Sequence, residues 1–88
     1  MNGHCLTFAD ETVIDGGEAG YAQGFLWCYI TGYTMQQAAT IFFDTDKTSR
    51  IEFHYGEMVD TYEGFTECIC ITIDVDGKIS VGLKKGAE

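Results

Sequence analysis

The chain has 88 residues, of which 45% are hydrophobic, and its 14 acidic and five basic side chains give a formal charge of −9. This charge argues against direct binding to nucleic acid, because the phosphate backbone would repel so acidic a surface. The apolar content excludes a disordered chain. The longest apolar run, residues 25–30, is far shorter than the roughly 18 residues of a membrane span, and the first residues lack the pattern of a signal peptide. We therefore expect one cytoplasmic domain over residues 1–88.

Residues 5–24 predict a hairpin followed by a loop. Leu6 and Phe8 alternate with smaller side chains, and the apolar pair Val13-Ile14 follows a break at Asp10, which is the pattern of two short strands. Residues 15–24 hold four of the eleven glycines and almost no large apolar side chain, so we expect a loop. Its glycines lack the spacing of a phosphate-binding loop, and the neighbouring acidic side chains would repel an anion.

An apolar strand and an amphipathic helix are predicted next. Residues 25–31 are apolar on both faces, which favours a central place in a sheet. Thr34 and Gln37 have the spacing of a capping box, and the residues after Thr34 continue with the period of a helix of about three turns, near residues 35–44. Its apolar stripe consists of Met35, Ala38, Ala39 and Phe42. We expect this helix to cover one face of the sheet, and the polar residues 44–49 to form a solvated turn.

The last part of the chain predicts strands at residues 51–55 and 58–62 and a hairpin over residues 67–83. Between residues 68 and 75 the large apolar side chains alternate with smaller or polar ones, which indicates a strand with one buried face. The buried set is Ile69, Ile71, Ile73 and Val75. Asp76-Gly77 suits a type I′ turn better than a calcium loop, because Leu83 stands where such a loop needs a bidentate Glu. Together the elements predict an α+β fold, mainly an antiparallel sheet of about five to seven strands with one short helix on one face.

The four cysteines have neither the spacing of a disulfide framework nor that of a zinc knuckle. On a regular strand Cys68 and Cys70 share a face about 6.5–7 Å apart, too far to pair without distortion. Reduced thiols are therefore expected. A metal site built from His4, Cys5, Cys68 and Cys70 is an alternative, but the preferred interpretation has no metal and no cofactor.

Catalysis would require a nucleophile and a base that are held together. If the strand at residues 51–55 pairs with the hairpin, His54 could face Cys68 or Cys70, an arrangement used in acyl transfer. The alternative, an exposed His near half-buried cysteines, is preferred. We therefore expect no catalytic residue and no enzyme.

The pattern does single out a surface. With the apolar face of the sheet under the helix, the opposite face would present small polar and aromatic side chains, which suits a protein-binding or self-association surface. The predicted partner-binding residues are Trp27, Tyr29, Glu52, His54, Cys68, Cys70 and Thr72.

Several runs of the sequence resemble small acidic proteins, of unassigned role, that are encoded by phages and prophages of gut Firmicutes. These runs are LTFAD at residues 6–10, TMQQA at residues 34–38 with Phe42, KTSRIEF at residues 47–53, and TYEGF at residues 61–65 before an Asp-Gly hairpin. They are turns and core positions, so no functional residue is carried over from them. The resemblance implies a viral origin, in which small acidic proteins act in particle assembly or against host defences.

Three hypotheses follow, and the first is preferred. It is a non-enzymatic interaction module that binds a protein with a basic surface, as a phage-encoded inhibitor or nucleic-acid mimic acting on a host nucleic-acid-handling or defence protein. The second is a phage structural or assembly protein that self-associates through a sheet face as a homo-oligomer. The third is a thiol or metal site that uses His54, Cys68 and Cys70.

Overall fold

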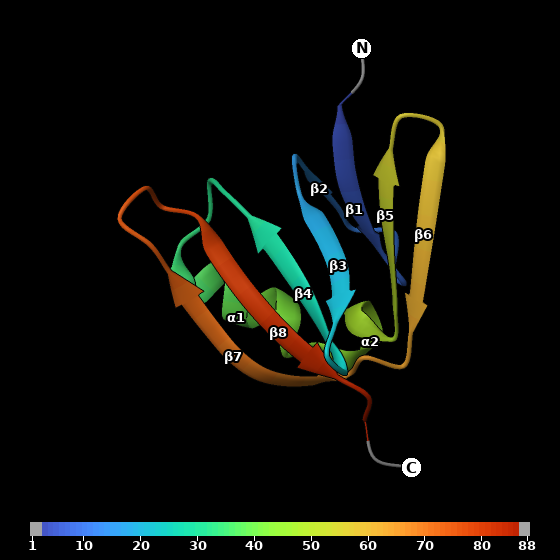
Figure 1. Ribbon diagram of the computed structural model, residues 1–88. Helices are drawn as coiled ribbons and strands as arrows, with labels where there is room; N and C mark the ends of the chain where they lie inside the picture. The colour runs from blue at the N-terminus through green and yellow to red at the C-terminus, as the bar shows by residue number, and fades with distance from the viewer. Residues whose placement is uncertain (1–2, 87–88) are drawn as a thin grey trace.

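The computed structural model describes residues 3–86, which fold into eight antiparallel strands and two short helices (Figure 1). The strands divide into two four-stranded sheets, with the orders β2-β1-β5-β6 and β3-β4-β8-β7. The strands are β1 (His4–Phe8), β2 (Val13–Asp15), β3 (Glu18–Ala22), β4 (Phe25–Ile30), β5 (Arg50–Tyr55), β6 (Met58–Glu63), β7 (Glu67–Ile73) and β8 (Ile79–Lys84). The predicted α+β class with antiparallel hairpins is confirmed. The strands are more numerous than expected, because one segment predicted as a loop is a strand, and they form two sheets where one was expected.

That segment is β3, within residues 15–24. It pairs with β4, so that Gly20 lies directly opposite Trp27. A Cβ on Gly17 would lie only 2.9 Å from the Leu6 side chain, so the chain passes close to β1 just before β3 begins. The small side chains that indicated a loop are thus those of an edge strand beside large aromatic residues, where pairing with β4 overrides the weak strand propensity of glycine and alanine.

The predicted first hairpin and central strand are confirmed. In β1, Leu6 lies opposite Ile14 of β2 on one side and Phe53 of β5 on the other. In the second sheet β4 lies between β3 and β8, the internal place that was predicted for it. Its buried side chains are Leu26, Cys28 and Ile30, and the half-buried side chains of its other face are Phe25, Trp27 and Tyr29.

The helix α1 (Met35–Phe42) begins with the predicted capping box. The Thr34 hydroxyl accepts a hydrogen bond from the Gln37 N–H at 3.0 Å, and the Thr34 N–H donates to Oε1 of Gln37 at 2.9 Å. Ala38 and Phe42 are fully buried, and α1 packs against β7 and β8 (Figure 1), so the predicted cover of the hairpin is confirmed. Met35, which was expected in the buried stripe, lies at its exposed end.

A second helix, α2 (Thr45–Thr48), occupies the segment predicted as a solvated turn. Asp44 caps it by accepting a hydrogen bond from the Asp46 N–H at 2.9 Å. Thr48 is fully buried, and its hydroxyl donates to the Asp44 carbonyl. The polar composition that indicated a turn is therefore that of a capped single turn of helix. None of the helices within residues 3–86 is long and apolar enough to cross a membrane.

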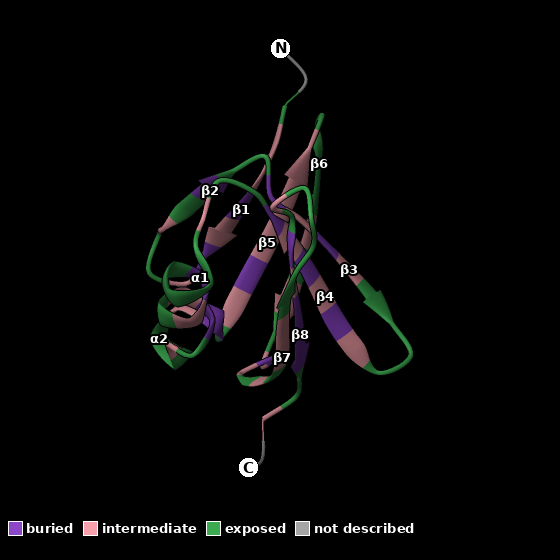
Figure 2. Cartoon of the chain, turned by 90° about the vertical axis from the view of Figure 1, so that its left-hand side faces the viewer, coloured by how far each residue is buried: buried purple, intermediate pink, exposed green. Residues whose placement is uncertain are grey.

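The core is shared by both sheets and α1 (Figure 2). Phe8 of β1 meets Phe42 of α1 edge to face, with ring centroids 5.6 Å apart. From the second sheet, β8 contributes a buried side chain at every other position, as the alternation predicted. The fully buried large side chains are Leu6, Phe8, Ile14, Leu26, Ile30, Phe42, Ile51, Ile79, Val81 and Leu83.

The turn of the β7–β8 hairpin is not the predicted type I′ turn. The Gly77 N–H donates to the Asp74 carbonyl at 3.0 Å, and the Asp74 N–H donates to the Lys78 carbonyl at 3.0 Å. Gly77 has a φ of 84°, whereas Asp76 has no positive φ, so the geometry is a type I turn followed by a left-handed glycine. Oδ1 of Asp74 accepts hydrogen bonds from the N–H groups of Asp76 and Lys78, which favours this longer connection.

A bulge interrupts the predicted alternation of β7. Cys68 lies opposite Leu83, whereas Cys70 lies opposite Gly82, so Ile69 is an extra residue with no partner on β8. Cys68 therefore faces the core side with Leu83, and Cys70 faces the outer side with Gly82. The expectation that these two cysteines share a face is wrong. The expected buried row is also wrong in part, because Ile69, Ile73 and Val75 are exposed and only Ile71 packs against the core.

Candidate functional site

The predicted partner-binding residues divide among three places. Four of them gather on the outer face of the second sheet, where Trp27 lies in register with Gly82 and Cys70, and Tyr29 lies in register with Ser80 and Thr72. Glu52 and His54 lie on the other sheet. Cys68 faces α1 on the inner side of β7 because of the bulge. The single surface expected from the sequence therefore does not form.

We call the first of these places the aromatic face, defined by Phe25, Trp27, Tyr29, Cys70 and Thr72. It is tightly built, because a Cβ on Gly82 would lie 2.9 Å from Cζ3 of Trp27 and 3.0 Å from Sγ of Cys70. The indole ring thus covers the backbone of β8. The Lys78 ammonium lies 5.2 Å from the centroid of the Tyr29 ring. All three aromatic side chains are half-buried by their own neighbours, so this face holds little unused apolar area.

His54 lies beside a cysteine, but a different one from those expected. It is directly opposite Cys5 of β1 and Val59 of β6, while Cys68 and Cys70 belong to the other sheet. The His54 ring lies 3.1 Å from Oε1 of Glu52, through Nε2. Because β1 and β5 are distant in sequence, the pairing of Cys5 with His54 has no local signal.

Burial favours the protonated form of two thiols of the second sheet, Cys28 and Cys68. Burial raises the pKa of the Cys28 thiol strongly, since this side chain of β4 is fully buried in the core. Burial also raises the pKa of Cys68, whose Sγ lies 3.7 Å from the Cys70 carbonyl oxygen. Since the thiolate is the nucleophile, neither environment activates a cysteine. No group of three or more metal-ligating side chains occurs within residues 3–86.

An apolar depression lies between α1 and β7, and we call it the α1–β7 groove. It has a volume of about 440 Å³. Phe43 is 64% exposed, Ile69 41% and Met35 38%, so large apolar side chains meet water on both sides of it. The bulge leaves Ile69 at this rim. The lining residues are Met35, Gln36, Ala39, Phe43, Cys68, Ile69, Cys70 and Ile71.

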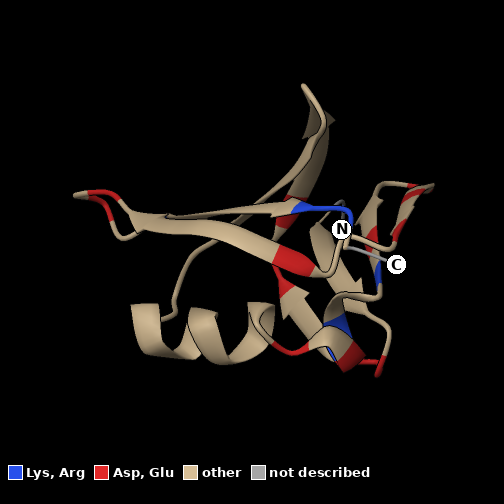
Figure 3. Ribbon diagram, turned by 90° about the horizontal axis from the view of Figure 1, so that it is seen from below, with Lys and Arg blue, Asp and Glu red and all other residues tan. Residues whose placement is uncertain are grey.

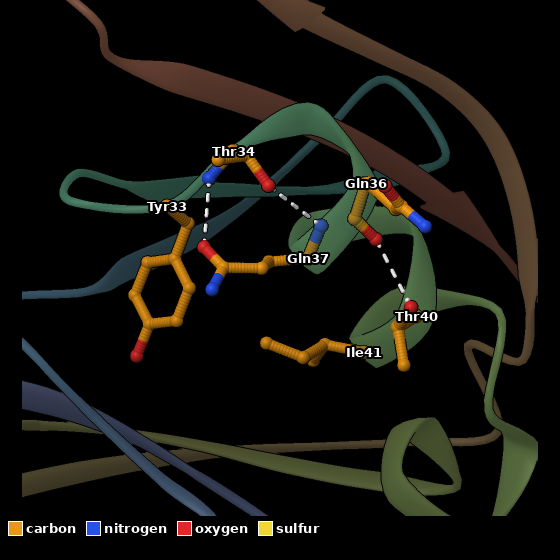
Figure 4. Close-up of a pocket in the computed structure, with 6 residues that line it drawn as sticks. All are labelled: Tyr33, Thr34, Gln36, Gln37, Thr40 and Ile41. Atoms are coloured by element: carbon orange, nitrogen blue, oxygen red, sulfur yellow. Dashed lines mark hydrogen bonds between the residues drawn. The ribbon is translucent and has the colours of Figure 1, made fainter.

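A second depression of about 600 Å³ follows the first turns of α1 (Figure 4). Several of its polar groups form hydrogen bonds within α1 or its cap. Thr34 and Gln37 form the capping box, and the Thr40 hydroxyl donates to the Gln36 carbonyl at 3.0 Å. Figure 4 shows these bonds running along the helix. The arrangement stabilises α1 and does not converge on a ligand.

The acidic residues are spread over turns and strands of both sheets (Figure 3). All five basic side chains, by contrast, are engaged within the molecule. Three of them form ion pairs: Lys47 with Asp10 and Asp44, Arg50 with Glu52, and Lys84 with Glu67. Lys78 and Lys85 lie over the rings of Tyr29 and Phe65. The charge left without an internal partner is therefore negative.

Sequence reasoning missed the α1–β7 groove. Phe43 follows the last residue of the apolar stripe and falls outside it, which is a readable sign of an exposed aromatic side chain. Ile69, however, was assigned to the buried row, because nothing in the alternation marks the bulge.

Comparison of the chain with protein families, with curated proteins and with solved structures finds no match. The fold and the described surfaces are therefore the basis for any function.

Proposed function

We propose that the protein is a non-enzymatic, acidic protein-interaction module that binds a partner with a basic surface. The observation that carries this proposal is the α1–β7 groove, where Met35, Phe43 and Ile69 expose apolar surface side by side. Contiguous exposed apolar surface on a small globular protein typically marks an interaction site. Protein interfaces typically have an apolar core that is surrounded by a polar rim.

The charge distribution supports a basic partner. The formal charge is −9, and three of the five basic side chains are already in ion pairs, so the molecule presents a net negative charge to an approaching partner. Complementary charge accelerates such encounters and selects against acidic partners. Since the carboxylates are dispersed, the charge steers the partner and the groove supplies the contact.

In its finer form the proposal follows the resemblance to phage proteins. The module then acts in the bacterial cytoplasm as an inhibitor of a host nucleic-acid-handling or defence protein, whose basic nucleic-acid site an acidic surface can occupy. Such a partner satisfies both requirements, a basic surface and an apolar contact.

The test compares wild-type protein with Phe43→Ala and with the matched control Val13→Ala, which shortens an exposed side chain of β2. Each is immobilised and exposed to a lysate of gut Firmicutes. We expect a basic protein that is retained by wild type and by Val13→Ala, is lost with Phe43→Ala, and is released as salt screens the charges. Retention that is indifferent to salt, or equal for all three proteins, would refute the proposal.

The aromatic face gives a second candidate, a structural protein that self-associates through Trp27 and Tyr29. It is supported by three aromatic side chains in one row of β4. Sedimentation that shows only monomers at high concentration would exclude it, and a dimer that dissociates with Tyr29→Ser would favour it.

A further inference from the structure

β7 is an edge strand, and the backbone edge that points away from β8 has no partner strand within the described residues. Soluble proteins usually protect such edges with Lys, Pro or inward charges. Residues 68–73 contain none of these, and Ile73 is 46% exposed. The bulge at Ile69 protects only the first part of the strand, so the backbone from Cys70 to Ile73 remains able to pair.

The two faces of this edge differ in character. On the α1 side, Ile71 and Ile73 pair in register with buried residues of β8. Ile71 lines the α1–β7 groove, and Ile73 follows it on the same face of β7. On the outer side, Thr72 lies between two acidic positions, Glu67 at the start of β7 and Asp74 just after its end. The Glu67 carboxylate forms a half-exposed ion pair with Lys84 at 3.7 Å. The Asp74 carboxylate accepts the N–H groups of Asp76 and Lys78 through Oδ1 and forms no ion pair within residues 3–86.

We propose that the partner binds by adding an extended strand to β7, with apolar side chains toward the α1–β7 groove and Lys or Arg side chains on the outer side. This inference rests on the proposed function and names the chemistry of its partner. Main-chain hydrogen bonds along the edge supply affinity, and the alternate side chains supply specificity. An alternating basic and apolar segment is the pattern that the two faces of β7 require.

A second copy of the chain fits this edge poorly. Antiparallel pairing of two β7 strands would bring the Glu67 end of one copy opposite the Asp74 end of the other, on the same outer face. Like charges placed in this way repel, and each copy carries a charge of −9. A basic strand is instead attracted by the net charge of −9, and Asp74 is an acidic position at this edge without an ion pair within residues 3–86.

The test uses an end-blocked peptide in which Lys alternates with Val around a central Phe. Its affinity is measured for wild type, for Ile73→Lys, and for Val59→Lys, which makes the same charge change on the exposed edge strand β6 of the other sheet. We expect wild type and Val59→Lys to bind alike and Ile73→Lys to bind at least about tenfold more weakly, because the new Lys repels the peptide and removes apolar contact. Amide exchange of residues 70–73 in the wild-type protein, with and without peptide, gives a readout that needs no variant, and we expect protection.

Each outcome decides between defined alternatives. Strand addition would be overturned if the peptide did not bind, or if Ile73→Lys and Val59→Lys weakened its binding equally. It would also be overturned if a peptide methylated on alternate backbone nitrogens bound equally well, or if the protein formed a dimer that Ile73→Lys dissociates. A peptide with Glu in place of every Lys tests the basic partner separately. If it binds β7 as well as the Lys peptide does, the charge premise of the proposed function fails while the strand site stands.

Discussion

Phe42 and Phe43 are neighbours at the end of α1, and they offer a matched test of how the helix is held. Phe42 is fully buried against Phe8, whereas Phe43 is mostly exposed at the α1–β7 groove. Truncation of a buried Phe to Ala typically costs about 3–5 kcal/mol, which combines lost transfer free energy with the cavity that remains. The edge-to-face contact with Phe8 accounts for about 0.5–1.5 kcal/mol of that loss. Phe43→Ala removes no core contact, so we expect a change within about 0.5 kcal/mol.

Urea unfolding measures the difference, with Trp27 fluorescence as the signal. Since domains of this kind have free energies of unfolding of about 5–15 kcal/mol, Phe42→Ala should lower the midpoint markedly. Phe43→Ala should superimpose on wild type with the same slope. Similar midpoints for the two variants would refute the described packing of α1, and a large loss for Phe43→Ala alone would show that the groove is part of the core.

Three further predictions concern positions with well-defined surroundings. Gly82→Ala places a Cβ 2.9 Å from an indole carbon of Trp27, so we expect the free energy of unfolding to fall by about 1–3 kcal/mol. In the control Gly20→Ala the new Cβ meets nothing within 4 Å, and comparable unfolding midpoints for the two variants would contradict this prediction. Hydrogen bonds from Lys47 and Thr12 lower the pKa of Asp10 from 3.8 to about 2. The contribution of Asp10 to stability is therefore present above pH 3.8 and is lost as the pH falls through about 2. NMR titration of Lys47→Met should show a higher pKa for Asp10. Burial raises the pKa of Cys28, so its labelling by a thiol reagent should be limited by opening of the fold, and fast labelling of the native protein would refute its enclosure.

Much of the fold was predictable because its signals are local. Two local signals specify α1: the capping box of Thr34 and Gln37, and the apolar stripe that ends at Phe42. Both lie within the few residues of the helix itself. The apolar side chains on both faces of β4 favour an internal strand, and the β7–β8 hairpin needs only a short connection. In these segments, side-chain period and turn chemistry agree, so sequence alone is sufficient.

The errors have non-local causes. β3 is a strand because β4 offers it a partner, and no property of its glycines and alanines indicates that. Cys5 and His54 meet through the pairing of β1 with β5, which are separated by most of the first half of the chain. The turn differs because one Asp74 carboxylate oxygen accepts two backbone N–H groups, a contact that residue frequencies alone do not distinguish from a type I′ turn. The candidate site was therefore harder to predict than the fold, since its residues come from segments joined only by folding.

The bulge in β7 connects these errors to the proposed site. In a regular strand the alternation would place Ile69 under α1, and both cysteines would lie on the outer face. The extra residue instead places Cys68 on the inner side and leaves Ile69 at the groove, next to Phe43. Full burial of an Ile side chain contributes about 1.5–3 kcal/mol, and with 41% of Ile69 still exposed the fold leaves part of that unused. A partner strand that covers Ile69 and Phe43 together would gain this remaining contribution on binding. The irregularity that misled the sequence pattern thus places apolar surface at the α1–β7 groove, beside the part of β7 proposed to pair with a partner strand.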